Sequence, residues 1–213
     1  MEGGPIRAAV MADTHGVLRP EVERILETCD VIIHAGDFDS QMLYHKLEVN
    51  QPLYAVRGNN DRGWSGGLAA VKRFEIGGVK FIMAHERADI PSPPGDVQVV
   101  IFGHSHMFYQ QEINGRLWLN PGSCGYKRFT LPLSLAVMTI EDGRFEGRPY
   151  GWKKVMEHRE LPRHRWKKPK QANMKSSSGA ISRRPGKREL KHRQGIRSSV
   201  PPKRKRRNAT ACS

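Results

Sequence analysis

Three short apolar runs near the start of the chain each end directly in a cluster of polar residues. The runs cover residues 6–12, 31–34 and 53–56, and apolar residues at helical spacing fill the intervals 20–29 and 40–49. A strand, helix, strand, helix, strand order requires right-handed crossovers between neighbouring parallel strands. The sequence therefore predicts an α/β fold built on a largely parallel sheet.

The chain after residue 70 has a different pattern, in which short apolar runs are paired around turns. Residues 72–84 and 110–119 each read as a hairpin, the first turning at Gly-Gly and the second at Asn-Gly. Further strands are expected at 97–102, 135–140 and 143–146. These segments indicate a second sheet, so the expected architecture is a sandwich of two mixed β-sheets flanked by helices.

The net charge of +15 is not spread evenly along the 213 residues. Residues 1–150 carry 15 Lys and Arg against 18 Asp and Glu, a net charge of −3, whereas residues 151–213 carry 21 against 3, a net charge of +18. Apolar periodicity also stops after Tyr150, and such a segment cannot bury enough apolar surface to offset the entropy lost on ordering. We expect one globular domain at 1–150 and a basic, disordered C-terminal tail at 151–213.

The basic tail 151–213 carries the charge needed to bind polyanions, with RNA, DNA and acidic membranes all open as partners. Only Trp152 and Trp166 offer aromatic contacts there, so the composition favours nonspecific nucleic acid binding over sequence-specific recognition. Residues 203–207 resemble a nuclear-localisation run. A solvated extension without a dedicated ligand stays open as the alternative.

The cysteines and the N-terminal residues indicate the cellular compartment in which the protein is expected. Cys29, Cys124 and Cys212 lie far apart and form no C-x-x-C pair, which argues against a disulfide framework and against a zinc knuckle. The first twelve residues lack the basic and apolar regions of an export signal, and no stretch reaches the roughly 18 apolar residues of a membrane span. A cytoplasmic location without a transmembrane segment is predicted.

Five polar clusters follow the predicted strands, and they contain carboxylate, amide and imidazole groups, which are ligands of divalent transition ions. Because the carboxyl ends of neighbouring parallel strands meet at one edge of a sheet, the clusters are expected to converge there. His34 and His45 lie outside them and are expected to be packed beside the site and on a helix face, respectively. The clusters are Asp13-Thr14-His15, Gly36-Asp37, Gly58-Asn59-Asn60-Asp61, His85 and Gly103-His104-Ser105-His106.

Together with Asn120-Pro121-Gly122-Ser123, these ordered motifs resemble the signature set of the calcineurin-like metallophosphoesterases over residues 6–142. The resemblance is strongest to the small bacterial and archaeal phosphodiesterases of the YfcE-like branch. It implies an αββα sandwich with a centre for two metal ions bridged by Asp37. One ion would be held by Asp13, His15, Asp37 and His106, and the other by Asp37, Asn59, His85 and His104.

The resemblance also implies a reaction. Two ions about 3.5 to 4 Å apart lower the pKa of a shared water, and the resulting bridging hydroxide attacks phosphorus. Two divalent ions beside ionised Asp13 and Asp37 leave a net positive charge, which suits phosphate esters better than neutral esters or peptides. We expect a metal-dependent phosphoesterase, more a phosphodiesterase than a phosphatase, with Asp37, Asn59 and His104 as catalytic residues. Manganese is the expected ion, with nickel, magnesium, iron or zinc open.

Several positions depart from the family pattern or stay open. Asn60 stands where many members carry a histidine that protonates the leaving group, which an amide cannot do. Glu86 replaces a usual glycine and either faces solvent or adds negative charge beside the site. Residues 87–96 contain three prolines and are expected to form a loop instead of a helix. Residues 120–123 are expected to be a turn that braces the site, with direct substrate contact as the alternative.

Two other classes of function stay open. The retromer subunit that shares this fold works through protein contacts, so a noncatalytic metal-binding scaffold is one of them. Against it, each expected ligand position in this chain keeps a residue that can bind metal. The other class is a polyanion-binding protein that acts through its basic tail.

Overall fold

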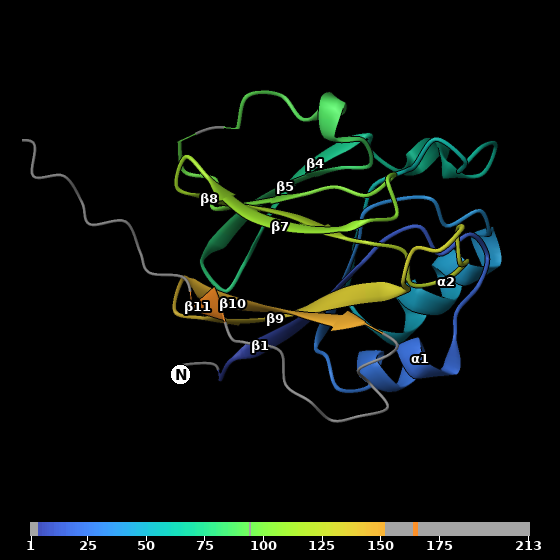
Figure 1. Ribbon diagram of the computed structural model, residues 1–213, viewed down its shortest axis with the longest axis horizontal. Coiled ribbons are helices and arrows are strands. Elements are labelled where there is room, and N and C mark those ends of the chain that lie inside the picture. The colour runs from blue at the N-terminus through green and yellow to red at the C-terminus, as the bar shows by residue number, and fades with distance from the viewer. Residues whose placement is uncertain (1–3, 94, 152–163, 166–213) are drawn as a thin grey trace, which may run out of the picture. The chain divides into compact units, whose positions relative to one another are not determined.

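The computed structural model describes residues 4–93, 95–151 and 164–165, and these form two β-sheets that pack face to face (Figure 1). The first sheet has six strands in the order β11-β10-β9-β1-β2-β3, and the second has five in the order β4-β5-β6-β8-β7. Both contain parallel and antiparallel pairs, which confirms the predicted sandwich of mixed sheets. The strands are β1 (Ile6–Met11), β2 (Val31–His34), β3 (Leu53–Ala55), β4 (Val71–Ile76), β5 (Val79–Ala84), β6 (Val99–Ile101), β7 (Phe108–Ile113), β8 (Arg116–Pro121), β9 (Ser134–Glu141), β10 (Arg144–Gly151) and β11 (His164–Arg165).

The first sheet contains the parallel strands β1, β2 and β3 that the N-terminal pattern predicts. Helices α1 (Pro20–Leu26) and α2 (Gln41–Asn50) connect these strands and pack on the outer face of the sheet. Pro20 starts α1, and the Ser40 side chain caps α2 by accepting a hydrogen bond from the Leu43 amide at 3.2 Å. β9 then pairs antiparallel with β1, which places a late segment of the chain beside its first strand.

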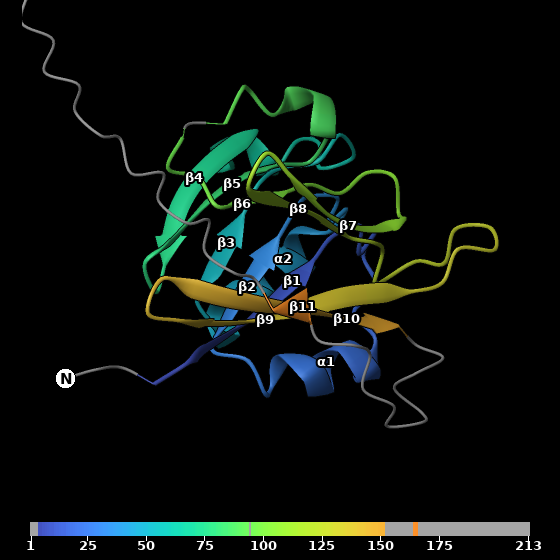
Figure 2. The same cartoon turned by 60° about the vertical axis from the view of Figure 1, so that its left-hand side comes forward.

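Figure 2 shows the two sheets as facing layers, and alternate residues of their strands fill the space between them. In β1, Ala8 and Val10 face the second sheet, while Ala9 and Met11 belong to the cluster beneath the helices. This two-residue period follows from strand geometry and sends every second side chain to the same face. Both faces of β1 are therefore buried from Ala8 to Met11, and after the exposed Arg7 the next polar residue is Asp13, just beyond the end of the strand.

The second sheet is covered differently from the αββα pattern, because both α-helices of the described residues lie on the first sheet. A segment containing the 3-10 turn η2 (Arg87–Asp89) covers its outer face instead, with Ile90 packed in an apolar cluster. The Arg87 guanidinium lies 4.9 to 5.5 Å from three ring centroids, those of Phe102, Tyr109 and Trp118. The expectation of a loop at 87–96 is met apart from this single turn.

The C-terminal boundary differs in detail from the expected one. β10 runs to Gly151, and β11 pairs with it through Glu146 and Gly147, so parts of the segment assigned to a disordered tail are strand. The rest of 151–213, with its predicted disorder and polyanion contacts, lies outside the described residues. In the part of the chain that the structure describes, no helix has the length and apolar character needed to span a membrane.

Candidate metal centre

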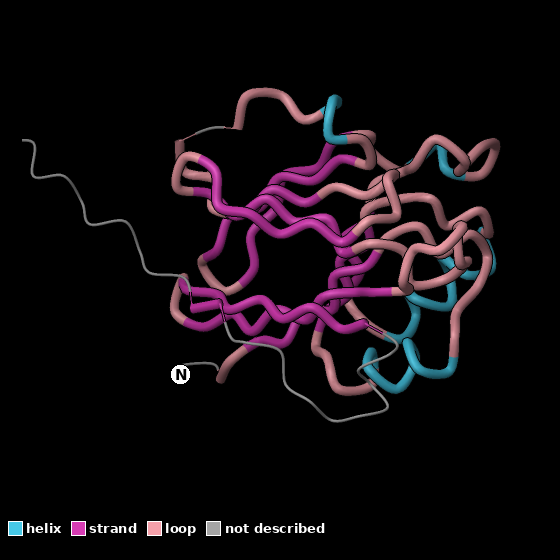
Figure 3. The backbone as a smooth tube through the Cα atoms, viewed as in Figure 1, coloured by secondary structure: helices cyan, strands magenta, loops and turns pink. Residues whose placement is uncertain are grey.

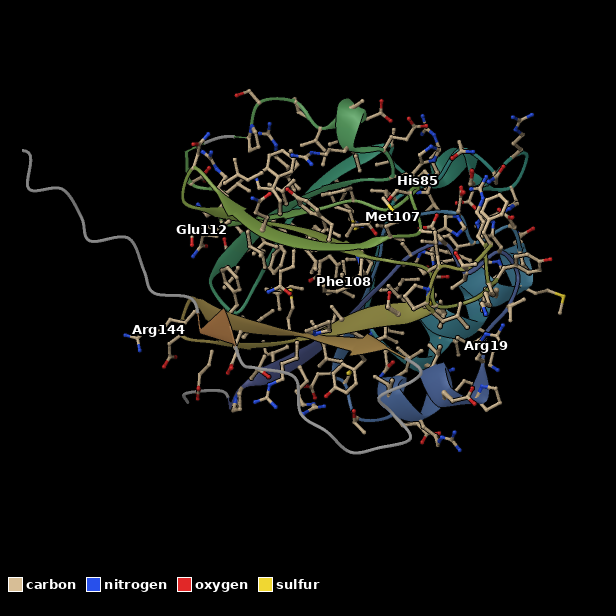
Figure 4. All side chains as sticks on the ribbon, viewed as in Figure 1. Arg19, His85, Met107, Phe108, Glu112 and Arg144 are labelled. Atoms are coloured by element: carbon tan, nitrogen blue, oxygen red, sulfur yellow. The ribbon has the colours of Figure 1, made fainter. Side chains whose placement is uncertain are left out.

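The polar clusters come together at one end of the sandwich, where strands of both sheets end in loops (Figure 3). Asp13 and His15 follow β1, Asp37 follows β2, and Asn59 follows β3. From the second sheet, His85 follows β5, while His104 and His106 follow β6. Figure 4 shows His85 at this end and Glu112 and Arg144 at the opposite end. The expected convergence is therefore found, and it joins the two sheets.

Asp13, His15 and His106 form the first group of candidate ligands, with one ligand atom of each within 4.8 Å of the others. His15 Nε2 lies 3.1 Å from His106 Nε2, and His106 Nε2 lies 3.5 Å from Asp13 Oδ1. The Asp39 carboxylate accepts a hydrogen bond from His15 Nδ1 at 2.7 Å, which leaves the lone pair on Nε2. Three ligand atoms thus point at a common position.

Asn59, His85 and His104 form the second group. The Asn59 Oδ1 atom lies 3.0 Å from His85 Nε2 and 3.0 Å from His104 Nδ1. The Ala35 carbonyl accepts a hydrogen bond from His85 Nδ1 at 2.8 Å, so Nε2 faces the Asn59 and Asp37 oxygens. Either a proton or a metal cation must lie between that nitrogen and two oxygen acceptors.

Asp37 lies between the two groups. Its Oδ2 atom is 3.4 Å from His85 Nε2 and 3.9 Å from His15 Nε2. Asn60 holds both oxygens of the carboxylate, because its backbone amide donates to Oδ1 at 2.9 Å and its Nδ2 donates to Oδ2 at 2.7 Å. The structure thus brings all seven residues predicted as metal ligands close together, with Asp37 between the two groups.

The buried polar atoms of this site are not satisfied by the protein alone. Asp13 Oδ1 and His106 Nδ1 are buried and have no hydrogen-bond partner among the described residues. Burial raises the pKa of the Asp13 carboxyl to about 7 and, together with the charge of His15, lowers the pKa of His106 to about 4. The lowered pKa keeps the His106 imidazole neutral with a free lone pair, and the raised pKa shows that the buried Asp13 carboxylate is disfavoured unless a cation lies beside it, which fits residues that hold a cation.

Asp37 and His85 show the opposite shifts, because they contact one another. Burial raises the pKa of the Asp37 carboxyl, but hydrogen bonds from His85 and Asn60 outweigh it and hold the pKa well below its usual range. Burial lowers the pKa of His85, but the hydrogen bond and the charge of Asp37 outweigh it and raise this pKa to about 9. The pair therefore already contains one positive charge beside Asp37, at the place where a cation would lie.

Backbone strain is concentrated at the same residues. Among the described non-glycine residues, nine have a positive φ, and six of these nine belong to the site. Left-handed backbone costs energy for side-chain-bearing residues and is retained where the surrounding structure imposes it. The six are Asp13, His15, Asp37, Asp39, His104 and His106, with φ between 45° and 69°.

Two residues of the site were not assigned a role from the sequence. Asp39 orients His15, and the buried Asp61 carboxylate accepts hydrogen bonds from four backbone amides, those of Asp37, Phe38, Asp39 and Gly58. The signal for Asp61 was its place at the end of the Gly-Asn-Asn-Asp cluster. Its structural role, however, is to hold the loop that carries Asp37.

Only glycine fits at position 58, because the loop that carries Asp37 packs directly against it. A Cβ atom at Gly58 would lie 2.0 Å from Asp37 Oδ1 and 2.3 Å from the Asp37 amide nitrogen. We therefore expect Gly58→Ala to displace Asp37 and to lower kcat/KM of any metal-dependent reaction at this site by about a hundredfold. Gly66→Ala is the matched control, because a Cβ at Gly66 meets nothing within 4 Å. Equal activity of the two variants would show that the placement of Asp37 is not critical.

The residues around the candidate ligands lie largely where the sequence predicts them. Asn120 Nδ2 donates to the Gly103 carbonyl at 2.7 Å, and Ser123 Oγ donates to the Asp13 carbonyl at 2.8 Å, so segment 120–123 braces the site. His34 is fully buried, and burial lowers its pKa to about 3. His45 is exposed on α2, and Glu86 is half-buried.

The fold and the site can now be compared with known proteins. The family model of the calcineurin-like phosphoesterase superfamily domain matches residues 6–143, so this chain belongs to that superfamily. The family is metal-dependent and takes its name from phosphoesterases. The match covers strands β1 to β9 and all seven candidate ligands, which supports the resemblance seen in the motifs.

Individual relatives are consistent with the family. A probable metallophosphoesterase of Methanothermobacter thermautotrophicus is 30% identical over 154 residues, 64% of this chain and 87% of that protein. A phosphodiesterase of Methanocaldococcus jannaschii is 28% identical over 144 residues, 57% of this chain and 86% of that protein. The structure of Vps29 from Entamoeba histolytica complexed with Zn²⁺ has a TM-score of 0.59 at 21% identity, covering 75% of this chain and 99% of that chain, and shows the shared fold.

Proposed function

We propose that this chain hydrolyses phosphate esters, diesters more than monoesters, with two divalent cations held by the seven residues of the candidate metal centre. The observation that carries the proposal is the position of Asp37 between two groups of ligand atoms. Asp13, His15 and His106 would complete one cation site with Asp37, and Asn59, His85 and His104 would complete the other. When bound, the two cations activate a water molecule as nucleophile and neutralise the negative charge of the phosphate.

The protein's own groups prepare the site for this chemistry. Asp39 and the Ala35 carbonyl orient the imidazoles of His15 and His85, while Asn60 orients the Asp37 carboxylate. Such fixed partners reduce the reorganisation needed during reaction and raise the affinity of the ligands for metal. The exposed side chains of Asn59 and His104 lie at the outer side of the site, where they can contact substrate.

Asn60 limits the substrates to those whose leaving group needs little protonation. Its side-chain amide donates to Asp37 and supplies no proton for a leaving group. Esters with leaving groups that need little protonation are therefore the favoured substrates. We propose manganese as the ion, because carboxylate and imidazole ligands suit it, and a reducing cytoplasm as the compartment, because Cys29 and Cys124 are free thiols.

The experiment uses the full chain after removal of metal with a chelator. Hydrolysis of bis-p-nitrophenyl phosphate and of p-nitrophenyl phosphate is measured with and without added manganese. We expect turnover that depends on manganese and is faster for the diester. Absence of turnover of both esters, while manganese remains bound, would contradict the proposal and favour a noncatalytic scaffold.

A further inference from the structure

A short exposed loop between β8 and β9 combines aromatic and basic side chains. Residues 126–129 read Tyr-Lys-Arg-Phe, and all four are exposed to solvent. Figure 2 shows the yellow loop before β9 projecting from the body of the domain. Aromatic residues of this size are usually buried, so two exposed rings in four residues call for an explanation.

The loop is tied directly to the candidate metal centre. Ser123 Oγ contacts both the Asp13 carbonyl, at 2.8 Å, and the Tyr126 carbonyl, at 3.0 Å. The Arg19 guanidinium donates to the Gly125 carbonyl at 2.8 Å, and Gly125 lies against the backbone of Thr14. The loop therefore begins at the residues that hold Asp13 and His15 in place.

The loop places a cation beside an aromatic ring. The Arg128 guanidinium lies 5.9 Å from the centroid of the Phe129 ring. A cation and an aromatic ring thus stand side by side at the margin of the site, a combination that suits an anion with an attached planar ring.

Phe129 is also the most unusual residue of the loop. Its side chain is 84% exposed, more than any other large apolar side chain of the described residues, and its backbone has a φ of 51°. A positive φ is an outlier for a bulky residue, and exposure of a whole ring to water is unfavourable. No burial within the described protein offsets these costs, which points to a contact made with a ligand.

We propose that Tyr126, Arg128 and Phe129 bind the nucleoside part and the phosphate of a nucleotide-type phosphodiester. The rings of Tyr126 and Phe129 would stack on the base, and Arg128 would contact the phosphate as it enters the metal centre. Stacking on an aromatic side chain tolerates every base, because each has a π face. This inference rests on the proposed phosphodiesterase activity and narrows its substrate class.

The test compares two diesters that release the same p-nitrophenolate, thymidine 5′-(p-nitrophenyl phosphate) and methyl p-nitrophenyl phosphate. The full, manganese-loaded chain is expected to favour the nucleoside ester in kcat/KM by at least about fivefold. The ratio should fall toward one in Phe129→Ala and decrease in Tyr126→Ala. Arg128→Gln should lower kcat/KM for both esters, since both carry the same anionic phosphate.

Val49→Ala is the matched control, because Val49 on α2 is an apolar side chain with nearly the same exposure, 83%, and should keep the wild-type ratio. A wild-type ratio near one, or a ratio unchanged in Phe129→Ala, would overturn the inference while leaving the proposed function intact. Titration calorimetry with thymidine 5′-monophosphate measures nucleotide binding without hydrolysis. It therefore distinguishes failure of the proposed phosphodiesterase activity from failure of the proposed nucleotide binding. If neither ester is hydrolysed, the proposed function fails. The nucleotide-binding role of the loop is then supported if Phe129→Ala weakens binding of thymidine 5′-monophosphate by about fivefold or more, and it is overturned if binding is unchanged.

Discussion

Replacing Asp37 with asparagine is expected to lower manganese-dependent kcat/KM for bis-p-nitrophenyl phosphate by about a thousandfold. Asparagine keeps the size of the side chain but removes the negative charge shared by the two groups of ligands. Its amide nitrogen cannot bind a cation and would face another donor, since both Asp37 oxygens accept hydrogen bonds from Asn60. The loss therefore combines weaker metal binding with a misplaced bridge.

Asp96→Asn is the control for this variant, because it makes the same chemical change in an exposed carboxylate paired with Lys80. It should retain wild-type activity. Thermal unfolding followed by circular dichroism shows whether Asp37→Asn remains folded. Activity of folded Asp37→Asn within tenfold of the wild type would contradict the bridging role of Asp37.

Replacing Asp61 with alanine is expected to lower the free energy of unfolding by about 4 kcal/mol. The four backbone amides that donate to this carboxylate, at 2.8 to 2.9 Å, would lose their acceptor in a largely buried loop. For a domain of this size the melting temperature should fall by about 10 °C. Differential scanning calorimetry of the metal-stripped full chain measures the change without a contribution from bound metal.

Two further variants sharpen the prediction for Asp61. Asp61→Asn keeps one acceptor oxygen and should be destabilised less than Asp61→Ala. Asp96→Ala removes an exposed carboxylate and should leave the melting temperature nearly unchanged. If Asp61→Ala and Asp96→Ala melted together, the four hydrogen bonds would not be what holds the Asp37 loop.

The sequence predicts the sandwich of mixed sheets and part of the way in which the candidate ligands converge. Ligands follow strands, and the ends of parallel strands meet, so the closeness of His15 and Asp37 follows from local patterns, whereas the approach of His85 from the second sheet does not. The pairing of β9 with β1 joins residues far apart in the chain, and no local pattern specifies it. Arg87 covers the second sheet by contacting three rings from distant positions in the chain, so this contact could not be predicted from local sequence either.

Residues that act through other residues were also missed. The role of Asp61 is not visible in its cluster, because three of its four partners come from residues 37–39, far away in the sequence, and only Gly58 is a neighbour. Asp39 reads as one more acidic residue after Asp37 until His15 is placed 2.7 Å away. The strained φ of the ligand residues follows from these contacts, since it is imposed by the assembled loops and not by residue type.

The most direct test of the proposed metal centre is the number of cations that the protein binds. The metal-stripped full chain is dialysed against manganese, and bound metal is measured by mass spectrometry beside the His85→Ala and His106→Ala variants. We predict two manganese ions per wild-type chain and fewer in each variant, because the variants remove a ligand from different groups. Wild-type protein that binds no manganese, or variants that bind as much as the wild type, would contradict the assignment of these residues to a two-metal site.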